Sequence, residues 1–206
     1  MHKQLKYEQN STYFMHLKIA ILASGSGSNA ENIINYFSNR PEFQFPMILS
    51  NKADAFVHQR AKKLQIPSFT FTKEEFEQGL PILNFLESYQ IDFIVLAGFL
   101  LKVPKVLIEN FPHKIINIHP ALLPKYGGKG MYGNRVHEAV SNAGETESGI
   151  TIHYVNENYD EGSIIFQLKC QLLPTDTPES IARKVHALEY EYFPKIIEKT
   201  CLKLLK

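Results

Sequence analysis

The chain has 206 residues, 44% of them hydrophobic and 21% charged, and a formal net charge of +1. These values are typical of a folded globular protein and exclude a collagen, a coiled coil and a largely disordered chain. Basic and acidic residues are scattered rather than clustered, which disfavours a surface that binds nucleic acid through many phosphates. Small-molecule partners are therefore expected, and nucleic acid is not.

The sequence also constrains location and domain number. No apolar stretch approaches the roughly 20 residues that span a bilayer, and residues 1–14 lack the apolar core of a signal peptide. We therefore expect a cytoplasmic protein without a membrane partner, in which Cys170 and Cys201 are free thiols. Residues 1–16 are predicted to be a flexible leader, and residues 17–200 to form a single domain.

From residue 17 onward, short apolar runs alternate with longer stretches of helical periodicity. Up to residue 119 the runs are continuously apolar, as in strands that are buried on both faces. Two later strands flank a polar turn and predict a hairpin. In chain order, the predicted elements are strand 17–23, a helix ending near 37, strand 45–50, helix 53–64, strand 67–71, helix 73–88, strands 93–97 and 114–119, helix 134–143, hairpin strands 149–155 and 163–170, and a final long helix.

This order predicts an α/β fold of the Rossmann-like, doubly wound type. The sheet is expected to be mostly parallel, with helices on both faces, and to be followed by a C-terminal β-hairpin and the long helix. Thr177 is suited to cap that helix and Pro178 to occupy its first position. In such sheets ligands bind beyond the carboxyl ends of the strands. Residues at those ends are therefore the first candidates for a functional site.

A glycine-rich loop, residues 25–30, follows the first strand and opens a helix. Glycines let the backbone approach a ligand closely, and free N–H groups at a helix start attract phosphate. The loop is also compatible with a plain tight turn, or with the G-x-G-x-x-A pattern of dinucleotide binding. Dinucleotide binding needs an acidic residue at the end of the second strand, but that strand ends without one and the next acid is Asp54. The sequence therefore favours a phosphate monoester over NAD.

Polar residues also end the strand at 114–119. Asn117 and His119 alternate, so both side chains point to one side of an extended strand, and Pro120 ends the strand there. An amide that donates a hydrogen bond beside an imidazole that moves protons is suited to attack on a carbonyl group. A structural histidine at a strand end is the alternative for His119 alone.

Two further groups of residues have both a structural and a functional interpretation. Asp160 lies in the turn of the predicted hairpin beside Glu161, and either acid is suited to a solvated turn. Asp160 becomes catalytic only if the fold brings this turn to His119. His186 and Glu189 lie three residues apart and thus on one face of the last helix. They form either an exposed helix pair or a pair that holds hydroxyl or amino groups of a ligand.

With these residues in view, the sequence resembles the folate-dependent formyltransferases, and among them the phosphoribosylglycinamide formyltransferases. The resemblance runs from about Leu17 to Ile197. The Leu-Leu-Pro sequence after the Asn-x-His-Pro step is shared by folate formyltransferases of this fold, whereas the Gly-Ser-Gly-Ser-Asn loop is more specific to the purine enzyme. The motifs that carry the resemblance are Lys18–Asn29, Val95–Phe99, Ile116–Tyr126, Ser148–His153, Asp160–Gly162 and Val185–Glu189.

The resemblance implies an enzyme of purine biosynthesis that transfers a formyl group from 10-formyltetrahydrofolate to phosphoribosylglycinamide, without a metal. It assigns catalysis to Asn117, His119 and Asp160. It places the ribonucleotide on Gly27, Ser28, Asn29, His186 and Glu189. The folate is expected to contact Lys73, Leu100, Leu101, Lys102, Val103, Asn117, Tyr159 and Asp160.

Several alternatives remain. Formyltetrahydrofolate hydrolase shares the catalytic residues but uses water as the nucleophile, and methionyl-tRNA formyltransferase needs a second, basic RNA-binding domain. A non-catalytic module that binds nucleotide phosphate would keep the glycine loop alone. The loop at 126–133 and the pair Leu101 and Lys102 depart from the better-known family pattern. The sequence leaves open whether the protein is a monomer or a homodimer.

Overall fold

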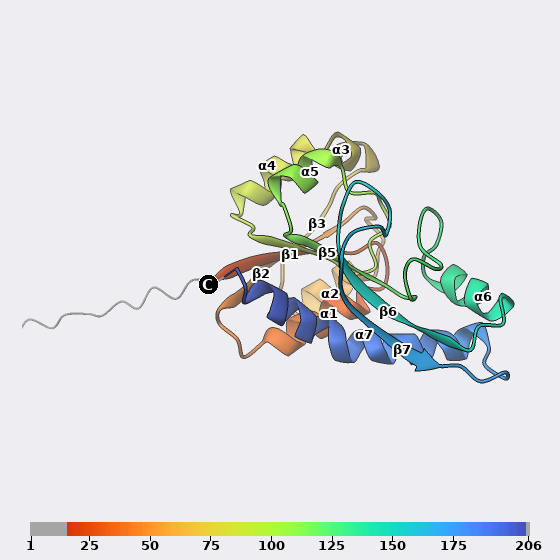
Figure 1. The fold of residues 1–206 in the computed structure, drawn as a ribbon. Helices are drawn as coiled ribbons and strands as arrows, with labels where there is room; N and C mark the ends of the chain where they lie inside the picture. The colour runs from red at the N-terminus through yellow and green to blue at the C-terminus, as the bar shows by residue number, and fades with distance from the viewer. Residues whose placement is uncertain (1–15, 205–206) are drawn as a thin grey trace, which may run out of the picture.

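The structure is a computed structural model that describes residues 16–204. The predicted leader lies outside the described residues except for His16, whose ring Nδ1 lies 2.8 Å from the carbonyl oxygen of Pro41. The strands are β1 (Leu17–Leu22), β2 (Phe43–Ser50), β3 (Ser68–Thr70), β4 (Phe93–Leu96), β5 (Ile115–His119), β6 (Glu147–Tyr154) and β7 (Ile164–Gln171). They form one sheet in the order β3-β2-β1-β4-β5-β6-β7 (Figure 1).

The sheet is parallel from β3 to β5, and the hairpin of β6 and β7 continues it with antiparallel pairing. The helices are α1 (Ser28–Phe37), α2 (Val57–Lys63), α3 (Lys73–Gln78), α4 (Leu80–Ser88), α5 (Lys105–Asn110), α6 (Asn134–Asn142) and α7 (Pro178–Cys201). The predicted fold class, hairpin and long final helix are therefore confirmed. Thr177 caps α7 through a capping box, and Pro178 begins the helix, as predicted.

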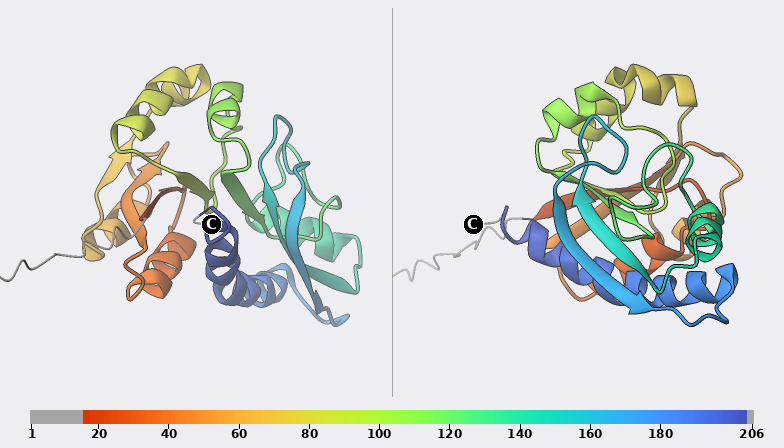
Figure 2. Two further views of the ribbon diagram at one scale, coloured as in Figure 1. Left: turned by 60° about the vertical axis from the view of Figure 1, so that its left-hand side comes forward. Right: turned by 45° about the vertical axis from the view of Figure 1, so that its right-hand side comes forward.

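Helices cover both faces of the sheet (Figures 1 and 2). One apolar core joins α1, α2, α6 and α7 to one face, and a second joins α3, α4 and α5 to the other. Alternate residues of β1 explain this division, since Ile19 and Ile21 enter the first core while Ala20 and Leu22 enter the second. The continuous apolar strands of the sequence are thus buried on both faces.

Two helical predictions needed correction, and one helix was not predicted. The helix predicted at 73–88 is two helices, α3 and α4, because Gly79 between them has a left-handed φ of 77°. A side chain at Gly79 would approach within 2.2 Å of Val106 on α5, so glycine also permits close packing there. Helix α5 was not predicted, and α2 begins at Val57 rather than at residue 53.

The strand order reverses between β1 and β4, which creates the crevice where ligands bind in sheets of this type. The glycine loop leaves β1 at this crevice, and the segment after β4 leaves beside it. The next strand, β5, carries Asn117 and His119 at its carboxyl end.

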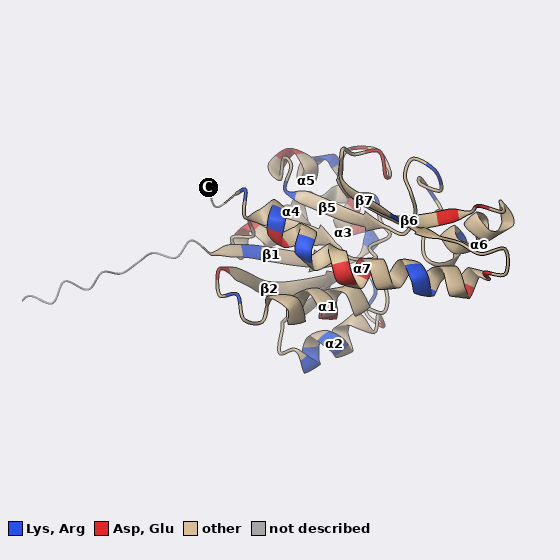
Figure 3. Cartoon of the chain, turned by 60° about the horizontal axis from the view of Figure 1, so that its bottom comes forward, with Lys and Arg blue, Asp and Glu red and all other residues tan. Residues whose placement is uncertain are grey.

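The surface carries mixed charge. Basic and acidic residues are interspersed along α7 (Figure 3), consistent with the scattered charges of the sequence. Within residues 16–204, no helix is both long and apolar enough to cross a membrane.

Candidate active site

A cleft of about 690 Å³ lies along the carboxyl ends of the parallel strands. The glycine loop, the segment after β4 and the end of β5 contribute to its walls, as do the loop before α6, the turn after β6 and helix α7. Of the residues predicted from the sequence, ten line this cleft: Gly27, Ser28, Asn29, Leu100, Asn117, His119, Tyr159, Asp160, His186 and Glu189. The fold thus gathers residues separated by up to 162 positions.

Asn117 and His119 end β5 as predicted, and the antiparallel neighbour β6 fixes what lies beside them. In the register of this pair, Asn117 lies opposite His153 and His119 opposite Thr151. His119 is 3% exposed. Its Nε2 atom lies 2.7 Å from the backbone carbonyl oxygen of Tyr126. Because a carbonyl oxygen only accepts, Nε2 of His119 carries the proton and Nδ1 faces the opposite way.

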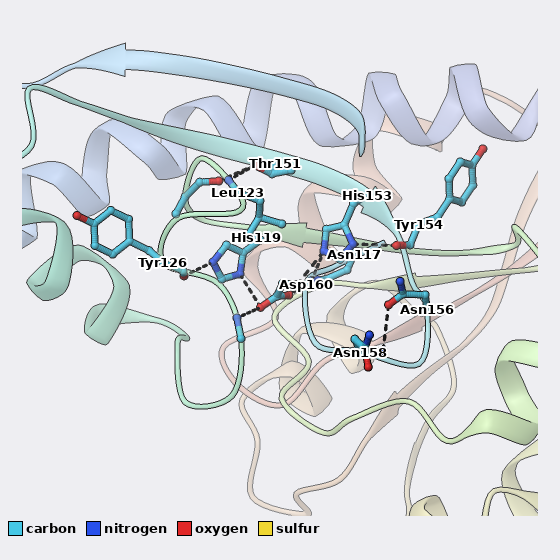
Figure 4. A network of polar contacts seen from close by, with 12 residues as sticks. Asn117, His119, Leu123, Tyr126, Thr151, His153, Tyr154, Asn156, Asn158 and Asp160 are labelled. Atoms are coloured by element: carbon cyan, nitrogen blue, oxygen red, sulfur yellow. Dashed lines mark hydrogen bonds and ion pairs between the residues drawn. The ribbon is translucent and has the colours of Figure 1, made fainter. Parts of the chain in front are cut away.

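Asp160 reaches this cluster from the turn between β6 and β7 (Figure 4). One carboxylate oxygen, Oδ2, lies 3.5 Å from Nδ1 of His119 and accepts a 2.9 Å hydrogen bond from the backbone N–H of Gly128. The other, Oδ1, accepts a 3.4 Å hydrogen bond from the Asn117 amide. Asp160 holds this position with a left-handed φ of 57°, which aspartate adopts more readily than most residues. The turn is therefore brought to His119, which was the condition for a catalytic interpretation of Asp160.

The electrostatics of the pair favour a charged carboxylate beside a neutral imidazole. Burial lowers the pKa of His119 below its usual value, although the charge of Asp160 and the Tyr126 carbonyl oppose this shift. Burial acts to raise the pKa of Asp160, but the contacts with His119 and with the Gly128 N–H act against it, and that pKa lies below its usual range. His119 is thus available to accept a proton, and Asp160 is ready to stabilise the resulting imidazolium.

The sequence interpretation missed His153. Its Nδ1 lies 2.8 Å from the carbonyl oxygen of Tyr154, so Nδ1 carries the proton and Nε2 is an acceptor. That acceptor receives a 3.2 Å hydrogen bond from the Asn117 amide and lies 3.6 Å from Asp160. His153 thereby fixes which end of the Asn117 amide faces Asp160. The available signal was the position of a second histidine in a strand predicted to lie near the first.

Thr151 on β6 holds the segment after β5 to the sheet by hydrogen bonds. Its hydroxyl donates to the carbonyl oxygen of Ala121 at 2.6 Å and accepts from the N–H of Leu123 at 3.0 Å. This anchoring sets the path of the chain to Tyr126 and Gly127. A side chain at Gly127 would lie 2.6 Å from Leu123 and 3.3 Å from Asp160. Glycine there permits the loop to pass close to the carboxylate.

The other end of the cleft is built from the glycine loop and α7. Gly27 precedes α1 with a φ of 72°, and the first N–H groups of a helix lack intrahelical partners. Asn29 donates from Nδ2 to Oε2 of Glu189 at 3.1 Å, and Nδ1 of His186 lies 3.7 Å from the same oxygen. Glu189 is 8% exposed. Burial raises its pKa, partly offset by the Asn29 hydrogen bond and by His186.

A second, smaller hollow adjoins the cleft at Asn117, Tyr159 and Asp160, which line both. Leu101, Lys102 and Val103 line this hollow together with His153. The structure therefore brings the predicted folate residues together, with one exception. Lys73 lines neither space and pairs with Glu77 on the exposed side of α3.

Comparison with known proteins identifies the family. Residues 17–197, most of the chain, match the family described as formyl transferase. The chain belongs to this family. Among curated relatives, the phosphoribosylglycinamide formyltransferase of Haemophilus influenzae is 38% identical over 186 residues, which are 88% of this chain and 85% of the relative. The chloroplastic enzyme of the same name from Arabidopsis thaliana is also 38% identical, over 92% of this chain and 67% of the relative.

Solved structures agree with this formyl transferase assignment. Phosphoribosylglycinamide formyltransferase from Anaplasma phagocytophilum superposes with a TM-score of 0.80 at 34% identity, covering 88% of this chain and 85% of that one. The enzyme of the same name from Bacillus halodurans gives a TM-score of 0.80 at 33% identity, covering 88% and 94%. The family match at residues 17–197 contains all seven strands and most of α7, so the cleft described above lies within the formyl transferase fold.

Proposed function

We propose that this formyl transferase moves the formyl group of 10-formyltetrahydrofolate to the primary amine of phosphoribosylglycinamide, a step of purine biosynthesis, within one domain of residues 17–200. The observation that carries the proposal is the meeting of Asn117, His119 and Asp160 at one end of a cleft whose other end is the glycine loop. The two curated relatives described above, each 38% identical to this chain, are named phosphoribosylglycinamide formyltransferase.

The ribonucleotide is proposed to lie along the cleft with its phosphate at Gly27, Ser28 and Asn29. The N–H groups and the dipole at the start of α1 favour a negative charge there. His186 and Glu189 face the same space from α7 and are suited to hold the ribose hydroxyls. This placement directs the glycyl amine away from the loop and toward the end of β5.

The donor is proposed to place its pterin ring against the residues that line the second hollow. Backbone groups of Leu100, Leu101, Lys102 and Val103 are available to contact the ring edge, and the turn with Tyr159 and Asp160 closes over it. Asn117 lies where the hollow and the cleft meet. The formyl group and the amine would therefore meet beside Asn117. A role for Lys73 at the folate glutamate stays a prediction.

The chemistry follows from the hydrogen-bonding capacity of these groups. The neutral amine attacks the formyl carbon, a C–N bond forms, and the carbonyl oxygen becomes an oxyanion. The Asn117 N–H that makes the long 3.4 Å bond to Asp160 is the one available to donate to that oxygen, while the other N–H stays bonded to His153. The bond from the formyl carbon to the folate nitrogen then breaks, and that nitrogen receives a proton while the amine loses one.

His119 is proposed to carry this proton at Nδ1. In the neutral ring Nε2–H donates to Tyr126 and Nδ1 has a free lone pair. A proton taken from the amine at Nδ1 creates an imidazolium whose two N–H groups face the Tyr126 carbonyl and the Asp160 carboxylate. Both partners are acceptors, so the imidazolium makes hydrogen bonds with both of its N–H groups, whereas the neutral ring makes only one. The same Nδ1 then returns the proton to the leaving nitrogen.

The partners of the proposed reaction are small molecules. Among the described residues no group of three or more histidine, cysteine or acidic side chains is arranged to hold a metal ion, and the proposed steps use none. We propose either a monomer or a homodimer as the acting form. Cytoplasmic location stays a prediction.

The test is an absorbance assay of tetrahydrofolate release from 10-formyltetrahydrofolate, run with and without phosphoribosylglycinamide. Release that requires the ribonucleotide is the expected result. Release at the same rate without it would mean that water is the nucleophile and that the protein is a hydrolase. No release in either case would refute the proposal and would favour the alternative of a non-catalytic module that binds nucleotide phosphate.

A further inference from the structure

A buried serine outside the catalytic cluster links three strand ends at the crevice. Ser24 follows β1, directly before the glycine loop, and is 2% exposed. Its hydroxyl donates to Oδ1 of Asn51, which follows β2, at 2.7 Å. The hydroxyl oxygen of Ser24 in turn accepts a 3.0 Å hydrogen bond from the backbone N–H of Leu100, which follows β4. One side chain thus connects the ends of β1, β2 and β4.

The segment after β4 is held to β1 by three successive hydrogen bonds. The N–H of Ala97 donates to the carbonyl of Leu22 at 2.9 Å, and the N–H of Ser24 donates to the carbonyl of Gly98 at 3.1 Å. These two bonds involve only backbone and continue the sheet. The third, from Leu100 to the Ser24 hydroxyl, is the one that depends on a side chain. It therefore sets the direction in which residues 100–103 leave the sheet.

Asn51 sets the orientation of the Ser24 hydroxyl. A hydroxyl has one proton and two lone pairs. Because Oδ1 of Asn51 takes the proton, a lone pair is directed at the Leu100 N–H rather than the proton. Position 51 supplies the acceptor in this arrangement, and the NH₂ group of Asn51 makes no contribution to it.

The segment so positioned lies between the two substrate spaces. Leu100 lines the main cleft, and Leu101 lines the second hollow. We propose that Ser24 and Asn51 are positioning residues for the formyl donor, which hold the backbone at Leu100 so that residues 100–103 fit the folate. This inference rests on the proposed function, because it assumes that the second hollow takes a folate.

The glycine loop should be little affected by loss of the hydroxyl. The Ser24 N–H keeps its bond to Gly98, and the loop is held by other contacts, including the N–H of Val57 to the carbonyl of Gly25 at 3.1 Å and the Arg60 side chain to the carbonyl of Ser26 at 2.9 Å. A change confined to donor binding is therefore the signature of this role. A merely structural role would lower the stability of the protein without a different effect on the KM values of the two substrates.

The experiment compares Ser24→Ala, Asn51→Leu and Asn51→Asp, with Ser88→Ala as a matched control. Ser88 also uses its hydroxyl, toward the carbonyl of Phe85, but lies on the exposed end of α4. Steady-state KM is measured for each substrate, together with thermal unfolding and calorimetric binding of tetrahydrofolate. Ser24→Ala is expected to raise the KM for 10-formyltetrahydrofolate about tenfold, equivalent to about 1.4 kcal/mol, and the KM for the ribonucleotide less than about twofold.

Asn51→Leu is expected to raise the donor KM by a smaller factor, while Asn51→Asp keeps the acceptor and should match the wild type. Equal rises in both KM values would overturn the inference, as would a lower unfolding temperature with an unchanged donor KM. Wild-type protein that binds tetrahydrofolate but does not turn over would refute the proposed function alone, since weaker tetrahydrofolate binding by Ser24→Ala would still support the positioning role. Wild-type protein that binds no folate would overturn both.

Discussion

The two ends of the cleft recognise their ligands by different means. At the β5 end, side chains of Asn117, His119, His153 and Asp160 bond to one another and to two backbone groups of the following loop. At the α1 end, the expected phosphate site consists of backbone N–H groups, and the nearby side chains mainly hold the loop in place.

This difference has a consequence for substitutions. A network of side chains is sensitive to the loss of any functional group, because each loss leaves a buried partner unsatisfied. A backbone site tolerates the loss of a side chain but not a change in the path of the chain. The β5 end should therefore fail when groups are removed, and the α1 end when groups are added.

The largest contrast is expected between Asn117→Ala and Ser28→Ala. Loss of the Asn117 amide removes the proposed oxyanion donor and should lower kcat by about 10²–10³-fold. Loss of the Ser28 hydroxyl leaves its N–H in place and should change kcat/KM for the ribonucleotide by less than about threefold, because the backbone N–H is the proposed phosphate ligand. Steady-state kinetics of both variants measure this contrast. Similar losses in the two variants would remove the distinction between the ends of the cleft.

Gly27→Ala tests the α1 end by adding a group. The new Cβ would lie 2.4 Å from a methyl carbon of Val57, and the backbone there has a left-handed φ of 72°. We expect a rise of at least about tenfold in KM for the ribonucleotide and a loss of about 1–3 kcal/mol in the free energy of unfolding. Gly25→Ala is the matched control for stability, since a Cβ there meets no protein atom within 4 Å. Equal losses in the free energy of unfolding in the two variants would contradict a sterically constrained loop.

Glu189→Gln is expected to have a smaller effect. A glutamine oxygen still accepts from Asn29, so the loop keeps its contact with α7, but the negative charge that would attract hydroxyl protons is lost. The KM for the ribonucleotide should rise about three- to tenfold, with kcat changed less, because an uncharged acceptor bonds more weakly than a carboxylate. Kinetics with saturating donor measure this separation. A fall in kcat alone would place Glu189 in the chemistry rather than in binding.

The smallest change is expected in the titration of His119. Its pKa lies below the ordinary value of histidine because of burial, and Asp160 opposes that shift. Asp160→Asn removes the opposing charge, so the pKa of His119 should fall further. Titration of the ring proton by NMR measures the change. A rise in the His119 pKa in this variant would contradict the assigned electrostatics.

The sign of the pH effect on stability follows from the same shifts. The folded-state pKa of Asp160 is depressed, so its contribution to stability is present above its unfolded pKa and is lost as the pH falls through the folded value. The folded-state pKa of His119 is also depressed. The stability therefore rises with pH until the pH exceeds the unfolded-state pKa of this histidine, near 6.5. Both groups therefore favour the folded state at neutral pH over acid pH.

Much of the fold and of the candidate site could be predicted from the sequence because the sequence signals were local. Continuous apolar strands predicted the buried parallel sheet, and Pro120 with the alternation of Asn117 and His119 predicted their common position at a strand end. The glycine pattern at 25–29 predicted the loop that opens α1. These inferences depend on neighbouring residues and on strand geometry alone.

The rest depends on contacts between distant segments. The part played by His153 comes from its register opposite Asn117, and a register is not visible in either strand alone. The helix break at Gly79 depends on close packing against α5, which the sequence interpretation did not find. Asp160 and Glu161 were equivalent as acids in one turn, and only the fold distinguishes them.

The difference between Asp160 and Glu161 allows the most direct test of the proposed catalytic cluster. Asp160 lies 3.5 Å from His119 and accepts from Gly128, whereas Glu161 is exposed and accepts from the side chain of Asn158. The measurement is kcat for Asp160→Asn and Glu161→Gln under saturating substrates. We predict a loss of about 10²–10³-fold for Asp160→Asn, since it disables the proposed proton acceptor and its neighbour Asn117, and a value near that of the wild type for Glu161→Gln. Comparable activity in the two variants, or a larger loss for Glu161→Gln, would contradict the central role given to the Asp160 carboxylate.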